Sequence, residues 1–237
     1  MSNEPTMTPG MTMNERDARR RRLLLAMMGA GLAAPAILRE ASAQNLIPEA
    51  QGVRSLEGDV RVNGRRAATG TPVRAGDTVS TGSNAYVTFV VGLDAYLLRE
   101  NSRIDLAGQS LFISSLRLLT GKLLGVYGRS NARRELATRT ATIGIRGTGG
   151  YLEADYDKTY FCLCYGTADL TPTMQPGLRE VYSSTHHEAP RFIYGDNRRA
   201  MMESAPLVNH TDAELVLLEG LVGRTPPPTF MERYEAY

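Results

Sequence analysis

Short runs of alternating apolar and polar residues, separated by Gly, Asn and Asp, fill the chain from residue 51 to about residue 165. One of them covers residues 85–91, and its apolar members fall on one face of a strand: Ala85, Val87, Phe89 and Val91. Side chains of a strand alternate between its two faces, so this pattern predicts half-buried strands. Strand-like runs recur about every 8 to 12 residues, which is typical of an all-β sandwich, barrel or solenoid. No long helical period separates them, so a Rossmann-type enzyme is not expected.

Turn and helix signals sharpen this picture. Asn63-Gly64 follows an alternating run and predicts a type I′ hairpin. Further on, residues 178–184 and 191–194 have strand patterns. Thr211 and Glu214 form a capping-box pattern that opens one short helix, stopped by Gly223 and expected to cap the end of the β-body. Three prolines at 226–228 predict an extended tail.

The first 43 residues have the three parts of an export signal. A basic cluster at 19–22 precedes a weakly apolar run from Leu23 to about Leu38, and Ala41-Ser42-Ala43 forms an A-x-A cleavage site. Paired arginines before a run diluted by Gly and Pro favour the twin-arginine route, which exports folded proteins. The alternative is a leader retained as an anchor. The run is shorter than the roughly 20 residues that span a bilayer, so we expect cleavage, a periplasmic product and no stable membrane span.

Removing the leader changes the charge of the chain. The whole sequence carries 27 basic and 25 acidic residues, of which 6 and 4 lie in residues 1–43, so residues 44–237 have 21 of each. The mature chain is formally neutral and has no basic field that would gather nucleic acid or anionic lipid.

Four motifs carry a resemblance to a known family. They lie in order at residues 58–64, 73–82, 98–106 and 140–148, the last being Thr-Ala-Thr-Ile-Gly-Ile-Arg-Gly-Thr. Their order and spacing resemble the FecR domain, over about residues 52–171. A Gly-Leu-Asp turn at 92–94 departs from the family's usual Asp-Gly.

The resemblance implies a periplasmic module of short strands in a β-solenoid-like body. Membrane-spanning members of the family pass a signal from an outer-membrane transporter to a cytoplasmic sigma factor. Residues 1–18 are short and polar and do not resemble a cytoplasmic anti-sigma region, so the relay itself is not expected here. The implied organisation is a signal at 1–43, a FecR-like domain at 51–171, and a C-terminal extension at 172–237 with a β-hairpin and the short helix.

The shared residues have architectural roles in this interpretation. Asp77 and Thr81 are expected to bond turn amides, and Arg146 to bridge neighbouring turns. Glycines are expected where strands turn with positive φ or approach closely, at Gly76, Gly82, Gly144 and Gly147.

One constellation suggests chemistry. A hairpin of residues 158–170 and 179–188 centred near Gln175 would place Cys162, Cys164, His186 and Glu188 on one side of a ribbon. Two thiolates, an imidazole and a carboxylate suit zinc or copper, and haem is a further candidate. His187 joins the candidate ligands, although it points to the other face unless a bulge turns it.

Other interpretations of the cysteines stay open. Buried cysteines often act as small core residues, and a thiol pair outside the inner membrane can oxidise, although i, i+2 spacing strains a bridge. Cys-x-Cys followed by His-His matches no standard zinc spacing. Nucleophile elbows, zincin helices and P-loops are absent from the sequence.

The sequence therefore predicts a non-catalytic periplasmic module for binding or signalling. Its partner would be an envelope protein or a component of the cell wall or outer membrane, and its oligomeric state is open. The alternative is a small metal- or haem-binding protein built on Cys162, Cys164 and His186.

Replacing Arg20 and Arg21 together by lysine should leave an uncleaved precursor in the cytoplasm. Lysine keeps the positive charge of the n-region and removes only the specific twin-arginine recognition. Immunoblots of fractionated cells check this, and normal processing of the double variant would exclude the twin-arginine route.

Overall fold

A computed structural model describes residues 51–132, 134–196 and 201–234. The export signal predicted for residues 1–43 lies outside these ranges. Neither helix within them is long and apolar enough to cross a membrane.

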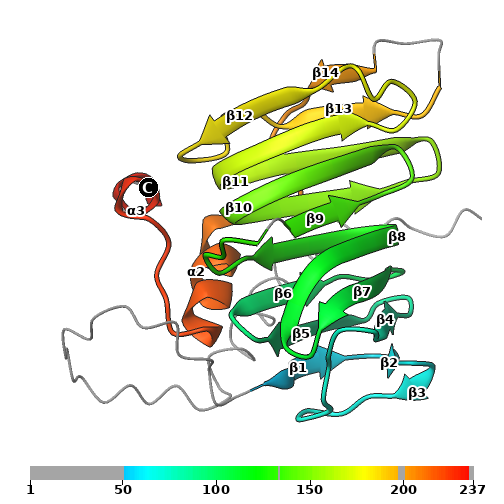
Figure 1. The fold of residues 1–237 in the computed structure, drawn as a ribbon. Coiled ribbons are helices and arrows are strands. Elements are labelled where there is room, and N and C mark those ends of the chain that lie inside the picture. The colour runs from blue at the N-terminus through cyan, green and yellow to red at the C-terminus, as the bar shows by residue number, and fades with distance from the viewer. Residues whose placement is uncertain (1–50, 133, 197–200, 235–237) are drawn as a thin grey trace, which may run out of the picture. The chain divides into compact units, whose positions relative to one another are not determined.

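The described chain is all-β with two short helices near its C-terminus, and this confirms the predicted fold class (Figure 1). The strands are β1 (Gly52–Glu57), β2 (Val60–Val62), β3 (Arg65–Arg66), β4 (Thr78–Thr81), β5 (Tyr86–Val91), β6 (Asp94–Leu98), β7 (Arg103–Gln109), β8 (Phe112–Val126), β9 (Arg134–Ala137), β10 (Ala141–Ala154), β11 (Lys158–Pro172), β12 (Glu180–Ser184), β13 (Arg191–Tyr194) and β14 (Met202–Ser204). The helices are α2 (Asp212–Leu221) and α3 (Pro228–Tyr234).

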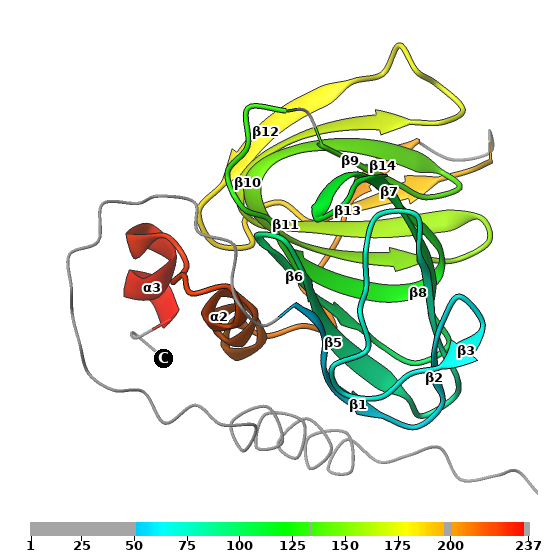
Figure 2. The same ribbon diagram turned by 60° about the horizontal axis from the view of Figure 1, so that its bottom comes forward.

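All fourteen strands of the described ranges belong to one rolled sheet, in which the long strands β8, β10 and β11 each take part in two halves. In the first half, hydrogen-bonded neighbours follow in the order β1, β5, β6, the last part of β8, the last part of β10, the first part of β11, β13 and β14. In the second half, the order of neighbours is β3, β2, β4, β7, the first part of β8, β9, the first part of β10, the end of β11 and β12. Figure 2 looks into the roll, and the pairs are antiparallel except β8 with β9.

Each long strand crosses between the halves at a glycine. Pairing changes after Thr120 on β8, between Arg146 and Gly149 on β10, and at Gly166 on β11. Gly121, Gly147 and Gly166 have φ values of +92°, +53° and +102°. Such a backbone bends the strand sharply and suits glycine, which has no Cβ to clash.

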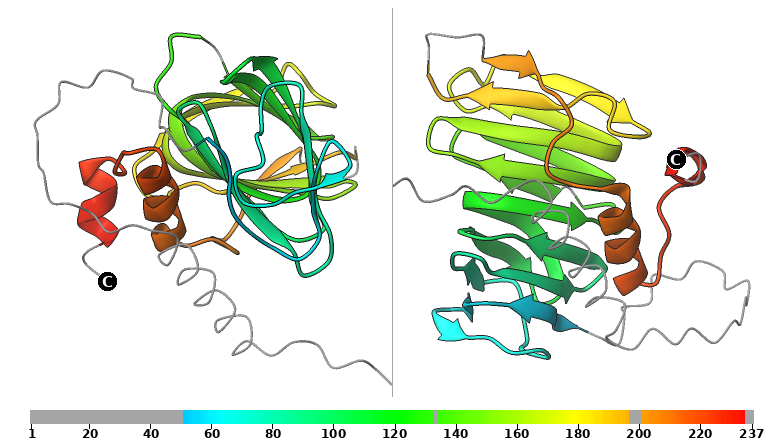
Figure 3. Two further views of the ribbon diagram at one scale, coloured as in Figure 1. Left: turned by 90° about the horizontal axis from the view of Figure 1, so that it is seen from below. Right: turned by 180° about the vertical axis from the view of Figure 1, so that it is seen from behind.

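Two buried layers follow from the roll. The main core lies between the halves and contains Phe89, Leu116, Leu123 and Phe161. A second layer lies on the other face of the first half, where Leu97, Leu124 and Tyr151 are fully buried outside the main core. Helix α2 contacts β6 and β8, so it covers that face rather than the end of the β-body as the sequence suggested (Figure 3).

Local sequence signals explain most of the elements. Asn63 and Gly64 both have positive φ between β2 and β3, as a type I′ turn requires. Thr211 and Glu214 form the predicted capping box of α2.

The predicted extended tail is wrong from Pro228 onward, because this proline begins α3. Proline suits the first helical position, where its missing N–H has no helical partner to lose.

The expected architectural roles are met in part. Gly76 and Gly147 have positive φ, whereas Gly82 and Gly144 do not. Asp77 accepts a hydrogen bond from the Arg74 amide at 2.7 Å. Arg146 is exposed, and within the described ranges its guanidinium makes no hydrogen bond or ion pair, so its predicted bridging role is wrong.

We expect Gly121→Ala to lower the free energy of unfolding by about 3 kcal/mol or more, because positive φ and overpacking both act there. A Cβ at this position would lie 2.5 Å from the Ser102 Cα. Gly147→Ala should cost only about 1 kcal/mol, since its Cβ would meet the flexible Arg129 side chain at 3.2 Å.

Urea denaturation of both variants checks this, with Gly177→Ala as control, because a Cβ there has nothing within 4 Å. Equal stability of the Gly121 and Gly177 variants would contradict the corner role.

Candidate metal centre

Two cysteines lie on the outer face of β11, in the second buried layer. Phe161 and Leu163 point into the main core, so Cys162 and Cys164 point to the opposite face by strand alternation. Both thiols are completely buried and free of a disulfide. They are buried residues of the second layer and not of the main core.

His187 reaches the cysteines through a bulge. The predicted hairpin register is confirmed from Gly166 opposite Ser184 to Leu170 opposite Glu180, but it ends there. Because β13 resumes with Arg191 opposite Phe161, the four residues 162–165 of β11 face the six residues 185–190. The His187 amide bonds the Cys164 carbonyl at 3.0 Å, and its φ is +53°.

This bulge exchanges the predicted roles of the two adjacent histidines. The Nδ1 atom of His187 lies 3.4 Å from the Cys162 sulfur, and the ring is buried. His186 points instead to Asp212, with its Nε2 atom 2.8 Å from the carboxylate. The prediction that His186 faces Cys164 and His187 turns away is wrong, because the register does not continue past Ser184.

A fourth donor comes from the segment before α2 and was missed in the sequence. The Nε2 atom of His210 lies 3.5 Å from the Cys164 sulfur and 3.1 Å from His187 Nδ1. Its ring stacks on Tyr151, with centroids 4.5 Å apart. His210 lies far along the chain from Cys164, and no periodicity connects the two positions.

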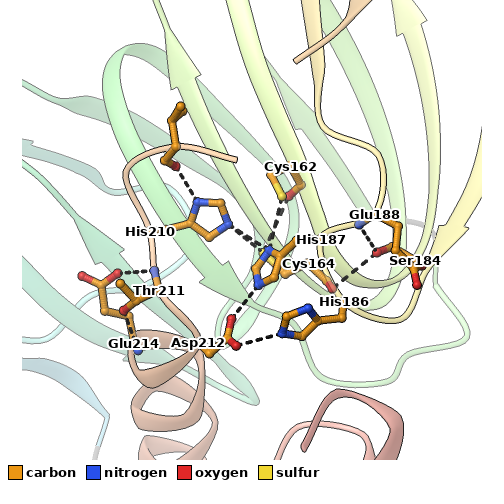
Figure 4. A network of polar contacts seen from close by, with 11 residues as sticks. Cys162, Cys164, Ser184, His186, His187, Glu188, His210, Thr211, Asp212 and Glu214 are labelled. Atoms are coloured by element: carbon orange, nitrogen blue, oxygen red, sulfur yellow. Dashed lines mark hydrogen bonds and ion pairs between the residues drawn. The ribbon is translucent and has the colours of Figure 1, made fainter. Parts of the chain in front are cut away.

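The four donors surround one buried point, as Figure 4 shows from close by. The ligand atoms of Cys162, Cys164, His187 and His210 all lie within 4.8 Å of one another. A tetrahedral zinc ion, with bonds of about 2.3 Å to sulfur and about 2.0 Å to nitrogen, requires S···N edges of about 3.5 Å and N···N edges of about 3.3 Å. Three of the six separations between these atoms, 3.4, 3.5 and 3.1 Å, are close to these edges.

The outer nitrogens of both imidazoles are held by acceptors. His187 Nε2 lies 2.8 Å from Asp212 Oδ1, and His210 Nδ1 lies 2.8 Å from the Val208 carbonyl oxygen. A carboxylate and a carbonyl accept hydrogen bonds, so in neutral rings both outer nitrogens carry the proton. The inner nitrogens then direct bare lone pairs at each other, an arrangement that favours a cation between them.

Asp212 lies in the first turn of α2, and its carboxylate contacts the two adjacent histidines, His186 and His187. Its two carboxylate oxygens accept from His187 and His186. Metal-bound histidines commonly donate their second N–H to a carboxylate or backbone carbonyl, which orients the ring. The two histidines that face the cysteines each have such a partner, Asp212 for His187 and the Val208 carbonyl for His210.

The environment of the thiols separates their acidities. The hydrogen bond from Cys164 and the contacts with His187 and His210 lower the pKa of Cys162 to about 3. Burial raises the pKa of Cys164 well above its usual value. Burial alone would lower the pKa of His187, but its contacts with Cys162 and Asp212 outweigh this and raise it. Of the two thiols, Cys162 is therefore the stronger acid.

No protein-family model matches the sequence, and no curated protein matches it. Two crystal structures of a proposed anti-sigma factor from Parabacteroides distasonis overlap with 54% of this chain, each with a TM-score of 0.45 and with identities of 10% and 9%. The overlap spans 59% of that chain, less than two thirds of its length. A likeness at this level carries no inference about activity or partners.

Proposed function

We propose that this protein binds one zinc ion through Cys162, Cys164, His187 and His210. The observation that carries the proposal is the convergence of four buried donor atoms within 4.8 Å, with separations near the edges of a zinc tetrahedron. A cation at this point would bind all four groups at once, and its binding free energy would stabilise the folded state.

The donor set favours zinc over the other candidates. Two sulfurs and two imidazole nitrogens in tetrahedral arrangement are a common structural zinc set. Copper(II) prefers a tetragonal plane. Haem needs donors along an axis with an open plane between them, whereas these four donors surround a point.

A closed set of four protein ligands supports a structural rather than a catalytic ion, because catalytic zinc keeps an open position for water. Cys162, His187 and Asp212 do form a chain like a thiol–imidazole–carboxylate triad. Two observations argue against Cys162 as a nucleophile. Its side chain is fully buried, and a second sulfur and a second imidazole face the same point. We infer a non-catalytic protein.

The zinc proposal predicts about one zinc per chain when the full-length protein is produced with zinc in the medium and analysed by elemental mass spectrometry. Cys162→Ser and His210→Ala should each lose most of it. At free zinc a thousandfold above Kd, the ion adds about 4 kcal/mol of stability. Removing it with a chelator should therefore lower Tm by about 8–16 °C.

The adjacent histidines supply the matched control. His187→Ala should lose zinc, whereas His186→Ala should keep about one ion, because the His186 ring lies outside the four donors. Metal-free wild-type protein, or zinc loss in the His186 variant alone, would overturn the assignment.

A second role is compatible with this centre, namely an exported FecR-like module that binds an envelope partner. It is favoured by the resembled segments, which fold into the neighbouring strands β2, β4 and β7 and into β10, beyond β8 and β9 in the same half of the sheet. On their exposed face Arg66 lies opposite Arg61, which also pairs with the Asp59 carboxylate at 3.1 Å, and Ser80 lies between Arg61 and Arg103. Like charges placed opposite each other destabilise a sheet, which favours an acidic partner on this face.

This role predicts that immobilised protein retains a defined acidic protein from periplasmic extract. Arg61→Glu with Arg103→Glu should abolish retention, and Arg139→Glu, an exposed arginine elsewhere, should not. Equal retention by both variants, or none by the wild type, would contradict the role of this face.

A further inference from the structure

The chain after β14 forms an arm, residues 205–234, that carries one zinc donor and covers the others. Its polar contacts with the β-body are distributed along its length. Arg99 bonds both Glu214 and the Asn209 carbonyl at 2.8 Å, and Tyr165 bonds Glu219 at 2.5 Å.

Apolar contacts of the arm lie directly over the donors. Phe230 of α3 is fully buried, and its ring centroid lies 4.9 Å from that of His186 and 5.7 Å from that of His187. Leu215 and Leu218 of α2 are fully buried as well. Both cysteines are completely buried, and the two histidines that face them are at most 7% exposed, so a chelator in solution cannot reach the ion while the arm is docked.

From this arrangement, and resting on the zinc centre proposed above, we propose that the arm is a gate: zinc leaves or enters only when residues 205–234 detach from the β-body. His210 belongs to the gate itself, so opening also removes one of the four donors. Asp212, two residues later, moves with it and releases His187 from its carboxylate. Opening therefore weakens the ion's coordination and exposes it in a single event.

The coupling between zinc binding and arm closure is reciprocal. If the closed arm strengthens zinc binding, bound zinc stabilises the closed arm by the same free energy. Local opening of a segment with a free energy below that of global unfolding is common near chain termini. Zinc should slow amide exchange in residues 211–222 without affecting strands of the second half such as β4 and β7.

The test measures the rate at which the full-length zinc protein transfers its ion to an excess of a coloured chelator. Phe230→Ala removes packing over the histidines and leaves all four donors intact. We expect it to keep about one zinc per chain as purified and to release it at least about tenfold faster than wild type. Leu218→Ala weakens α2 in the same way and should give the same result if the Phe230 variant folds poorly.

Leu116→Ala is the control matched to Leu218→Ala, since it removes the same side-chain volume from the main core between the halves. It should lower global stability but leave the release rate within about twofold of wild type, because it does not loosen the arm. If the Leu116 variant accelerates release as much as the Phe230 variant, release requires global unfolding and the gate is wrong. If neither arm variant changes the rate while zinc content stays near one, the gate fails and the zinc centre stands. A wild-type protein without zinc would instead overturn the centre, and the gate with it.

Discussion

Four electron-pair donors converge on one buried point, and the C-terminal third of the molecule is arranged around the need to satisfy them. The sulfurs come from β11, one imidazole from the bulge before β13, and the other from the start of the arm. Each inner nitrogen depends on an outer acceptor, Asp212 or the Val208 carbonyl, to direct its lone pair inward. Other contacts join these segments as well, since β11 pairs with β13 and Tyr165 of β11 bonds Glu219 of the arm.

The β-body supplies the rigid side of this junction. Strands β8, β10 and β11 run through both halves of the roll, and positive-φ glycines at their corners let them do so. Apolar side chains on both faces of the first half explain why β6 is buried at every position. One face packs into the main core, and the other receives α2 and the donors. If the strands of the first half were apolar on one face only, their second face would be exposed to water.

The sequence was sufficient for features encoded by local spacing. Alternation placed Cys162 and Cys164 on one face, the turn centre near Gln175 gave the register of β12, and Thr211 marked the start of α2. It was insufficient where the structure departs from regular pairing. The left-handed residue His187 adds a bulge that no local signal announces, because histidine is not a usual turn residue. His210 approaches through tertiary packing of the arm, and the three prolines at 226–228 predict an extended tail where Pro228 begins a helix.

Helix α2 is ten residues long, a length at which an isolated helix is marginal in water because its first turn must be ordered before any hydrogen bond is gained. His210 precedes its N-cap residue directly, and Asp212 begins the helix. An ion bound at His210 fixes the backbone at the point where nucleation has to occur, and the Asp212 contact orients the first turn. The metal would therefore act as a nucleus for secondary structure, and folding of the C-terminal helix would follow metal capture in time.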